Sequence, residues 1–264
     1  MPHELPGGAD DPALLRRLDQ VLDPELDEPI TELGFVRAIE LRGDHATVSL
    51  RLPTSWCAVN FAYMMAEDVR RALLAADGIR QVTVLLGDHC AAGEIETAVN
   101  SGMPFGQAFS GEGPGDHLAA LRLTFQRKGF LARQFRLLKS LRLAGWSFSA
   151  IAAFRLGEIV TTGEDLAIQT KGTAAVAYGA AEALRRYVER RAELGIDCGP
   201  LAPLMVNSDG ASLTPQLLED HYRVARTARL SLEANGSFCR AVLAARDADA
   251  RDKNETKGGM HVPA

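Results

Sequence analysis

Residues 99–116 divide the chain into two stretches with different patterns, and this division constrains the fold more than any other feature. The segment reads VNSGMPFGQAFSGEGPGD, in which glycine and proline recur too often for a helix or a strand to continue. The sequence therefore predicts a linker at 99–116 between an N-terminal domain of residues 1–98 and a helical domain of residues 117–250. Residues 251–264 are expected to form a polar tail.

The stretch before this linker follows the order helix, strand, strand, helix, strand. Residues 12–22 place apolar side chains on one helical face. Residues 35–52 alternate apolar and polar side chains around Gly43-Asp44, which is typical of a β-hairpin. Residues 59–76 return to helical spacing, and residues 79–87 are rich in β-branched and aliphatic side chains. We therefore expect an α+β protein, with a small α-β-β-α-β domain followed by a mostly α-helical domain.

In the second stretch we expect helices almost throughout, with a short strand at 203–207 and a final helix from Pro215 that breaks at Asn235-Gly236. Residues 135–159 loosely resemble a helix-turn-helix segment of the kind found in MerR-type regulators, and they are basic. The wing and the tyrosine-bearing region of those regulators are missing. A helical hairpin that docks a partner, or plain core packing, explains the same residues, so nucleic acid is not the expected partner.

Charge is distributed unevenly along a chain whose net charge is only -5. Residues 4–44 hold eleven acids against four arginines, whereas residues 118–157 hold eight Lys or Arg and no acid. Such asymmetry is typical of solvated faces, but it could also dock the two halves or bind an acidic partner. The sequence shows no secretory signal, no span long enough for a membrane and no CxxC pair. We therefore expect a cytoplasmic protein.

One cysteine lies where a reactive thiol would be expected. Cys57, in LPTSWCAVN, stands on the predicted turn between a strand and a helix. Unpaired N–H groups and the dipole at a helix N-terminus favour a thiolate, which is a better nucleophile and metal ligand than a thiol. The alternative is a small, packed hydrophobic residue. Cys198 and Cys239 are expected to be structural only.

With these motifs in place, residues 12–90 resemble the metal–sulfur cluster assembly family typified by SufT and PaaD-like proteins. The resemblance rests on Asp23-Pro24-Glu25, on Glu32-Leu33-Gly34, and on Thr54 with Cys57 at the strand-to-helix turn. It implies a small α/β module that assists iron–sulfur cluster assembly through partner proteins. Ala58 departs from the pattern, because family members commonly have proline after the cysteine.

The resemblance implies that the family's functional thiol is Cys57 and its functional acid Asp23, with Glu25 and Thr54 supporting the turns. Iron–sulfur clusters typically need four soft ligands, so Cys57 could hold metal only with help. A second subunit, a partner protein, Cys90 or His89 could supply that help if the loops meet. Alternatively, the segment from Asp88 to Cys90 is only an exposed loop, and Asp23 only caps a turn.

The sequence therefore predicts a non-enzymatic accessory protein that helps to mature an iron or iron–sulfur centre in a client metalloenzyme. One branch of the family serves multicomponent oxygenases, so such an enzyme is a candidate client. The expected cargo is a transiently held iron or iron–sulfur cluster, with no other cofactor, and the expected partners are the client, other assembly factors or a second copy of the chain. The alternatives are a non-metal assembly scaffold or folding chaperone and, less favoured, a DNA-binding regulator.

Overall fold

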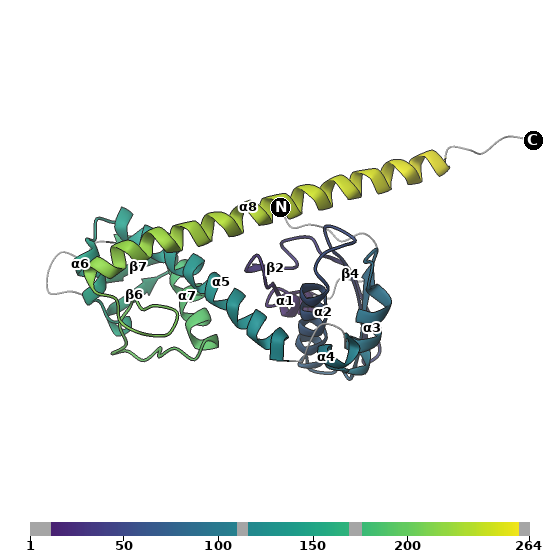
Figure 1. The fold of residues 1–264 in the computed structure, drawn as a ribbon, viewed down its shortest axis with the longest axis horizontal. Helices are drawn as coiled ribbons and strands as arrows, with labels where there is room; N and C mark the ends of the chain where they lie inside the picture. Colours follow the sequence, from purple (N-terminus) through teal and green to yellow (C-terminus); the bar gives the residue numbers. More distant parts are fainter. Residues whose placement is uncertain (1–11, 110–115, 169–175, 259–264) are drawn as a thin grey trace, which may run out of the picture. The chain divides into compact units, whose positions relative to one another are not determined.

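The computed structural model describes residues 12–109, 116–168 and 176–258. The chain divides into two compact units: the first comprises residues 1–121 and 234–264, and the second comprises residues 122–233. Helix α8 (Pro215–Gly258) is continuous and contributes residues to both units (Figure 1). The predicted break at Asn235-Gly236 is therefore wrong.

The first unit contains the predicted order of helices and strands, with short additions. Its elements are α1 (Pro12–Leu18), β1 (Leu22–Asp23), β2 (Glu28–Pro29), β3 (Val36–Arg42), β4 (His45–Arg51), α2 (Val59–Leu74), β5 (Gln81–Gly87), α3 (Ala92–Ser101) and α4 (Phe105–Ala108). The α+β class is confirmed, and so is the hairpin, whose turn holds Gly43 at a positive φ of 65°. Strands β1 and β2 pair within a segment expected to be a loop.

A three-stranded sheet organises this unit. Its strand order is β3-β4-β5, in which β3 and β4 are antiparallel and β4 and β5 are parallel. Buried side chains alternate along β4 and β5, as Val48, Leu50, Val84 and Leu86 illustrate. Helices α2 and α3 both pack against β5 and bury these side chains (Figure 1). This packing places the turn before α2 and the loop after β5 at the same edge of the sheet.

The predicted linker is wrong for residues 99–109, because they are part of the first unit. Val99 and Phe105 are buried, and the Phe105 ring centroid lies 5.3 Å from that of Tyr63. The Tyr63 hydroxyl also donates a hydrogen bond to the Met103 carbonyl. Gly102 terminates α3 with a φ of 74°, so this glycine ends a helix and does not open a flexible linker. Residues 110–115 lie outside the described residues.

The second unit is less helical than predicted. It contains most of α5 (Asp116–Leu143) and the first part of α8. Between them come α6 (Phe148–Ala153), the 3-10 helix η1 (Leu156–Glu158), β6 (Ile159–Thr162), β7 (Asp165–Ile168), β8 (Val176–Ala177) and α7 (Ala181–Glu193). Strands β6, β7 and β8 form an antiparallel sheet that the sequence analysis missed, because strands of two to four residues carry too little alternation to be detected.

The segment that resembled a helix-turn-helix packs as an ordinary part of this unit. Helix α6 has only six residues, and the Ser147 side chain caps it by accepting a hydrogen bond from Ala150 N. Ile151 and Phe154 are both buried in the core of the second unit. The apolar side chains of α6 therefore hold it to the core. None of the helices within the described residues combines the length and the apolar character that a membrane crossing requires.

Candidate functional site

Cys57 lies on the turn between β4 and α2, two residues before the helix begins at Val59. Ala58 occupies the N-cap position and offers no side-chain cap to the helix. The Cys57 side chain is half-buried against the core of the first unit, and its sulfur lies 3.2 Å from Thr54 Oγ1, within hydrogen-bonding distance. The thiol therefore lies at the N-terminal end of the helix, as predicted, with Thr54 as its nearest polar neighbour.

The loop after β5 reaches this turn. His89 is only 7% exposed, and its Nε2 lies 2.8 Å from the Cys57 carbonyl oxygen. The other ring nitrogen, Nδ1, accepts a hydrogen bond from Ala91 N at 3.1 Å, so the Nε2 proton is donated to Cys57. His89 thus holds the backbone of Cys57. Because both ring nitrogens are engaged, His89 would have to release one of these bonds before it could bind metal.

Cys90 joins the two loops through its backbone. Its N–H donates a hydrogen bond to the Ser55 carbonyl at 2.8 Å, while its side chain is exposed. The two loops therefore meet, which is the condition that the sequence analysis set for joint binding by Cys57 and this segment. Within the described residues, no group of three or more His, Cys, Asp or Glu has a geometry that could hold a metal ion. The assignment of Cys90 and His89 to metal or cluster transfer stays a prediction.

Asp23 is buried, and its carboxylate organises the turn that follows it. Oδ1 accepts hydrogen bonds from Glu25 N at 2.8 Å and Leu26 N at 2.9 Å, the arrangement of an Asx turn. Burial raises the pKa of this carboxyl to about 6, and the charges of Glu25 and Glu28 add to the effect, although the two hydrogen bonds oppose it. Asp23 therefore caps a turn in surroundings that disfavour negative charge.

Cys239 is a further thiol of this region that the sequence analysis treated as structural. It lies on the part of α8 that belongs to the first unit, and it is half-buried against the same core as Cys57. The pKa of its thiol is raised to about 11, mainly by burial, and the charges of Asp23, Cys57 and Glu25 contribute in the same direction. Cys239 and Cys57 thus pack against one core, and the charge of the Asp23 turn acts on the Cys239 thiol as well.

The comparisons with known proteins match the segment that contains Cys57 and Asp23. A model of the iron–sulfur cluster assembly protein family matches residues 12–86. The iron-sulfur cluster carrier protein of Deinococcus radiodurans is 41% identical over 75 residues, which cover 28% of this chain. Residues 12–86 form an iron–sulfur cluster assembly domain. The chain spans only 21% of the length of that relative. No solved structure matches the chain.

The predicted family resemblance is thus confirmed. Asp23, Glu25, Thr54 and Cys57 lie inside the assembly domain, whereas His89 and Cys90 follow it directly. Cys239 comes from a helix more than a hundred residues away in the sequence. No spacing motif links this thiol to the assembly domain, so sequence reasoning alone could not bring it to the site.

Helix α8 contacts both loops that meet at Cys57 through Arg246. Its Nη1 donates hydrogen bonds to the carbonyls of Leu52 at 2.8 Å and Pro53 at 3.1 Å, just before the Cys57 turn. Its Nη2 lies 3.5 Å from Asp88 Oδ2, just before His89. Arg51 also pairs with Asp88, at 3.2 Å. A single side chain of α8 therefore ties together the two loops that meet at Cys57.

The turn headed by Asp23 contacts α8 as well. Asn235 Nδ2 lies 3.4 Å from Glu25 Oε1, and Arg240 forms an ion pair with Glu28. Gly236 is buried between these contacts, and a Cβ there would lie 3.3 Å from Glu28 Oε1. The glycine lets α8 approach the turn closely, which brings Cys239, one helical turn further on, to the same place.

Proposed function

We propose that this chain is an accessory protein that receives iron or an iron–sulfur cluster at Cys57 and delivers it to a client metalloenzyme. The observation that carries the proposal is Cys57 itself, a half-buried thiol in an iron–sulfur cluster assembly domain, held at its backbone by His89 and coupled to a second thiol, Cys239. The proposed ligands from this chain are therefore two thiolates, one from the assembly domain and one from α8.

The electrostatics around these thiols suit a bound cation. Cys57, Asp23 and Glu25 all raise the pKa of Cys239, so each disfavours further negative charge there. The same charges stabilise a positive ion placed among them, and iron bound by the sulfur would displace the thiol proton. The Cys239 thiol, whose pKa is raised, would keep its proton without iron and become a thiolate ligand when iron binds.

Two thiols supply only half of the four ligands that an iron–sulfur cluster typically takes. The client or a second copy of the chain would provide the remainder, with Cys90, exposed at the meeting point of the loops, as a further donor. Incomplete ligation favours transfer over storage, because the cargo gains ligands when it moves to the client. The proposed role is delivery, with no turnover reaction of the chain's own.

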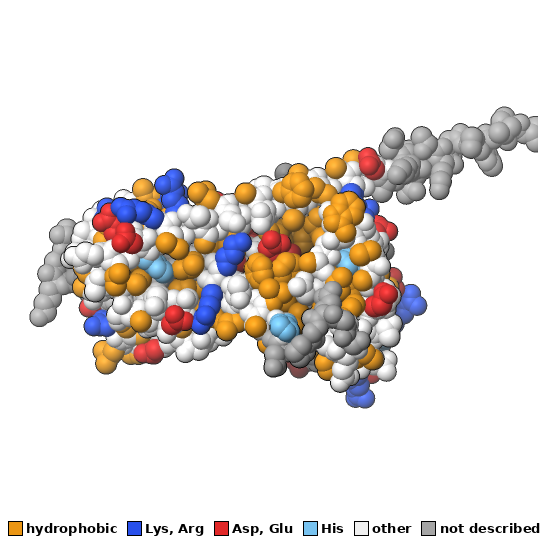
Figure 2. All heavy atoms as spheres, viewed as in Figure 1, with side chains coloured by type: hydrophobic (Ala, Val, Ile, Leu, Met, Phe, Trp, Pro, Cys, Tyr) orange, Lys and Arg blue, Asp and Glu red, His pale blue; other side chains and the backbone are white. Residues whose placement is uncertain are grey.

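Large exposed hydrophobic side chains near the thiols are suited to contact a client. Trp56 precedes Cys57 and is 76% exposed, and Phe238 precedes Cys239 and is 67% exposed. Hydrophobic side chains are prominent on the visible face of the first unit (Figure 2). Exposed aromatic residues of this size often become the most strongly contributing contacts of an interface. The client class that we favour is a multicomponent oxygenase, since one branch of the resembling family serves such enzymes.

The experiment compares client maturation in cells that carry wild-type protein, Cys57→Ser or Cys198→Ser. We expect Cys57→Ser to fold normally but to leave the co-purifying client enzyme without its iron and inactive. Cys198, an exposed thiol of the second unit, serves as the matched control and should load the client normally. Wild-type client iron content with Cys57→Ser would contradict cargo transfer and favour a scaffold that keeps the fold without the thiol chemistry.

A further inference from the structure

The second unit contains a pocket that the cluster chemistry does not use. It lies between α5 and the first part of α8, and its volume is about 400 Å³. This volume falls within the range of small-molecule sites in proteins. All of its lining residues belong to the second unit, so the pocket is complete without the assembly domain.

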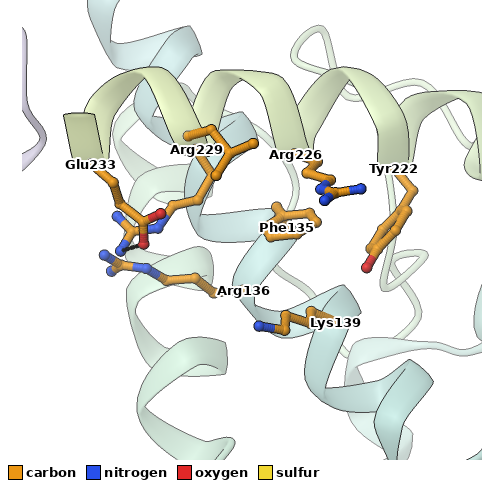
Figure 3. A pocket seen from close by; sticks show the side chains of 8 residues that line it. Phe135, Arg136, Lys139, Tyr222, Arg226, Arg229 and Glu233 are labelled. Atoms are coloured by element: carbon orange, nitrogen blue, oxygen red, sulfur yellow. Dashed lines mark ion pairs between the residues drawn. The ribbon is translucent and has the colours of Figure 1, made fainter. Parts of the chain in front are cut away.

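Cationic side chains dominate the lining of this pocket. Arg136 and Lys139 project from α5, and Arg226 and Arg229 project from α8, against the single carboxylate of Glu233 (Figure 3). Arg229 forms an ion pair with Glu233. Among the described residues, Lys139 and Arg226 make no hydrogen bond or ion pair. The pocket therefore concentrates positive charge at a concave surface, which attracts anions.

An aromatic wall stands beside these cations. The ring centroids of Phe135 and Tyr222 lie 5.0 Å apart with their planes tilted by 36°, and Tyr222 also contacts Phe148 edge to face at 5.7 Å. These contacts fix the Tyr222 ring, which is only partly buried and lines the pocket. Figure 3 shows Phe135, Tyr222, Arg226 and Lys139 around the same space. The pocket thus offers a flat apolar surface and several anion-binding groups within reach of one ligand.

We propose that this pocket binds a nucleotide, a ligand that joins a polyanionic phosphate group to a planar base. Arginine guanidinium groups match phosphate oxygens in geometry as well as charge, and lysine adds a point charge. The base would lie on the aromatic wall, since stacking of this kind tolerates every base. The confined volume favours a small molecule over an acidic segment of a partner protein.

The test measures binding of ATP, pyrophosphate and adenosine to the full chain by isothermal titration calorimetry at low ionic strength. We expect ATP to bind more tightly than pyrophosphate, and adenosine to bind weakest. Arg226→Gln and Lys139→Gln should each weaken ATP binding about tenfold, because each removes a charge-assisted contact. Arg223→Gln is the matched control, since Arg223 lies on the same helix but pairs with Glu219 and Asp220. It should leave ATP binding unchanged.

Three results would overturn the proposal. The first is equal binding of pyrophosphate and ATP, which would leave the aromatic wall without a role. The second is tighter binding of a hexaglutamate peptide than of ATP, which would assign the pocket to an acidic protein segment. The third is an equal loss of ATP binding with Arg223→Gln and Arg226→Gln, which would indicate diffuse attraction. If these variants lost ATP binding but still loaded the client with iron, the proposed delivery of iron or a cluster through Cys57 would not be affected.

Discussion

The cluster assembly domain and the C-terminal part of α8 belong to one compact unit, but they differ in how well they can be recognised from the sequence. Residues 12–86 match a family model, and their helices and strands follow recognisable local patterns. Residues 234–258 lie outside the family match, yet they contact both loops of the site and the Asp23 turn. The domain positions Cys57, and α8 contributes a second thiol, Cys239, and contacts the two loops and the Asp23 turn.

This difference shows that a recognisable domain need not be a complete site. The chemistry expected of Cys57 alone is limited by its single sulfur, whereas the proposed ligand role of Cys239 would give the same domain a second one. A helix outside the family match could therefore alter the ligand set of the matched segment. The predictions below separate what the domain contributes from what α8 contributes.

Among the changes in α8, the largest effect is expected from removing its thiol. Cys239→Ser should lower transfer of iron or cluster to the client about tenfold or more, because one of two thiolate ligands is lost while Cys57 remains. Far-ultraviolet circular dichroism should show an unchanged fold. The measurement is the rate at which purified, cluster-loaded protein restores the activity of the iron-free client.

Cys198→Ser is the matched control for this experiment, since it removes a thiol from the other unit. It should transfer cargo at the wild-type rate. Full transfer by Cys239→Ser would show that the assembly domain acts with Cys57 alone, and that α8 only covers it.

The next largest effect concerns stability. Leu243 of α8 is only 4% exposed and packs into the core of the assembly domain, against Gly34. Leu243→Ala should lower the free energy of unfolding of the first unit by about 2–5 kcal/mol, because it removes buried apolar surface and leaves a cavity. Leu217→Ala, at an exposed position of the same helix, should change it by less than about 0.5 kcal/mol. Urea denaturation measures both, and equal effects would mean that α8 is not part of this core.

Much of the first unit could be predicted because its signals are local. The hairpin turn at Gly43-Asp44, the alternation along β4 and the helix after Cys57 each occupy a few neighbouring residues. The parallel pairing of β4 and β5, which brings the two loops together at His89, was not predicted. The family resemblance pointed to the four predicted site residues that lie inside the matched segment.

The remaining features depend on contacts between distant residues. Asn235-Gly236 has the local character of a helix break, but the buried Gly236 lies against Glu28 inside a continuous helix. Residues 99–109 look like a linker, but Phe105 packs against Tyr63. Tertiary packing overrode local preference in both cases. Such contacts leave no periodicity in the sequence, so the packing of Cys239 against the same core as Cys57 could not be predicted.

A smaller, pH-dependent effect is expected at Asp23. Its pKa is raised from 3.8 to about 6, so the folded state binds the proton more tightly than the unfolded state does. The contribution of Asp23 to stability is therefore fully present below pH 3.8 and is lost as the pH rises through about 6. The loss corresponds to roughly 1–3 kcal/mol. Asp23→Asn keeps an oxygen for the turn and should abolish this loss, so the variant gains stability relative to wild type between pH 4 and pH 7.

Urea titrations at several pH values measure this difference. Asp77→Asn, which removes an exposed carboxylate of the same unit, should follow the wild type across the whole range. If the free energy of unfolding of Asp23→Asn differed from that of wild type by the same amount at every pH, burial would not govern the ionisation of Asp23. A variant less stable at every pH would show instead that the turn requires the carboxylate.

The smallest effect is expected from Gly236→Ala, because its gain in helix propensity and its steric cost contribute nearly equal and opposite amounts to the free energy of unfolding. Alanine is favoured over glycine inside a helix by about 1 kcal/mol, so Gly236→Ala gains helix propensity. The added Cβ would lie 3.3 Å from Glu28 Oε1 and 3.4 Å from Arg240 Nη2, and displacing this ion pair costs up to about 1 kcal/mol. Gly93 of α3 has no atom within 4 Å of an added Cβ, so Gly93→Ala gains propensity without crowding. Urea denaturation should show that Gly236→Ala is the less stabilising of the two substitutions. Equal stabilisation would mean that α8 does not approach the Asp23 turn closely at Gly236. Contacts elsewhere along the helix would then have to position Cys239.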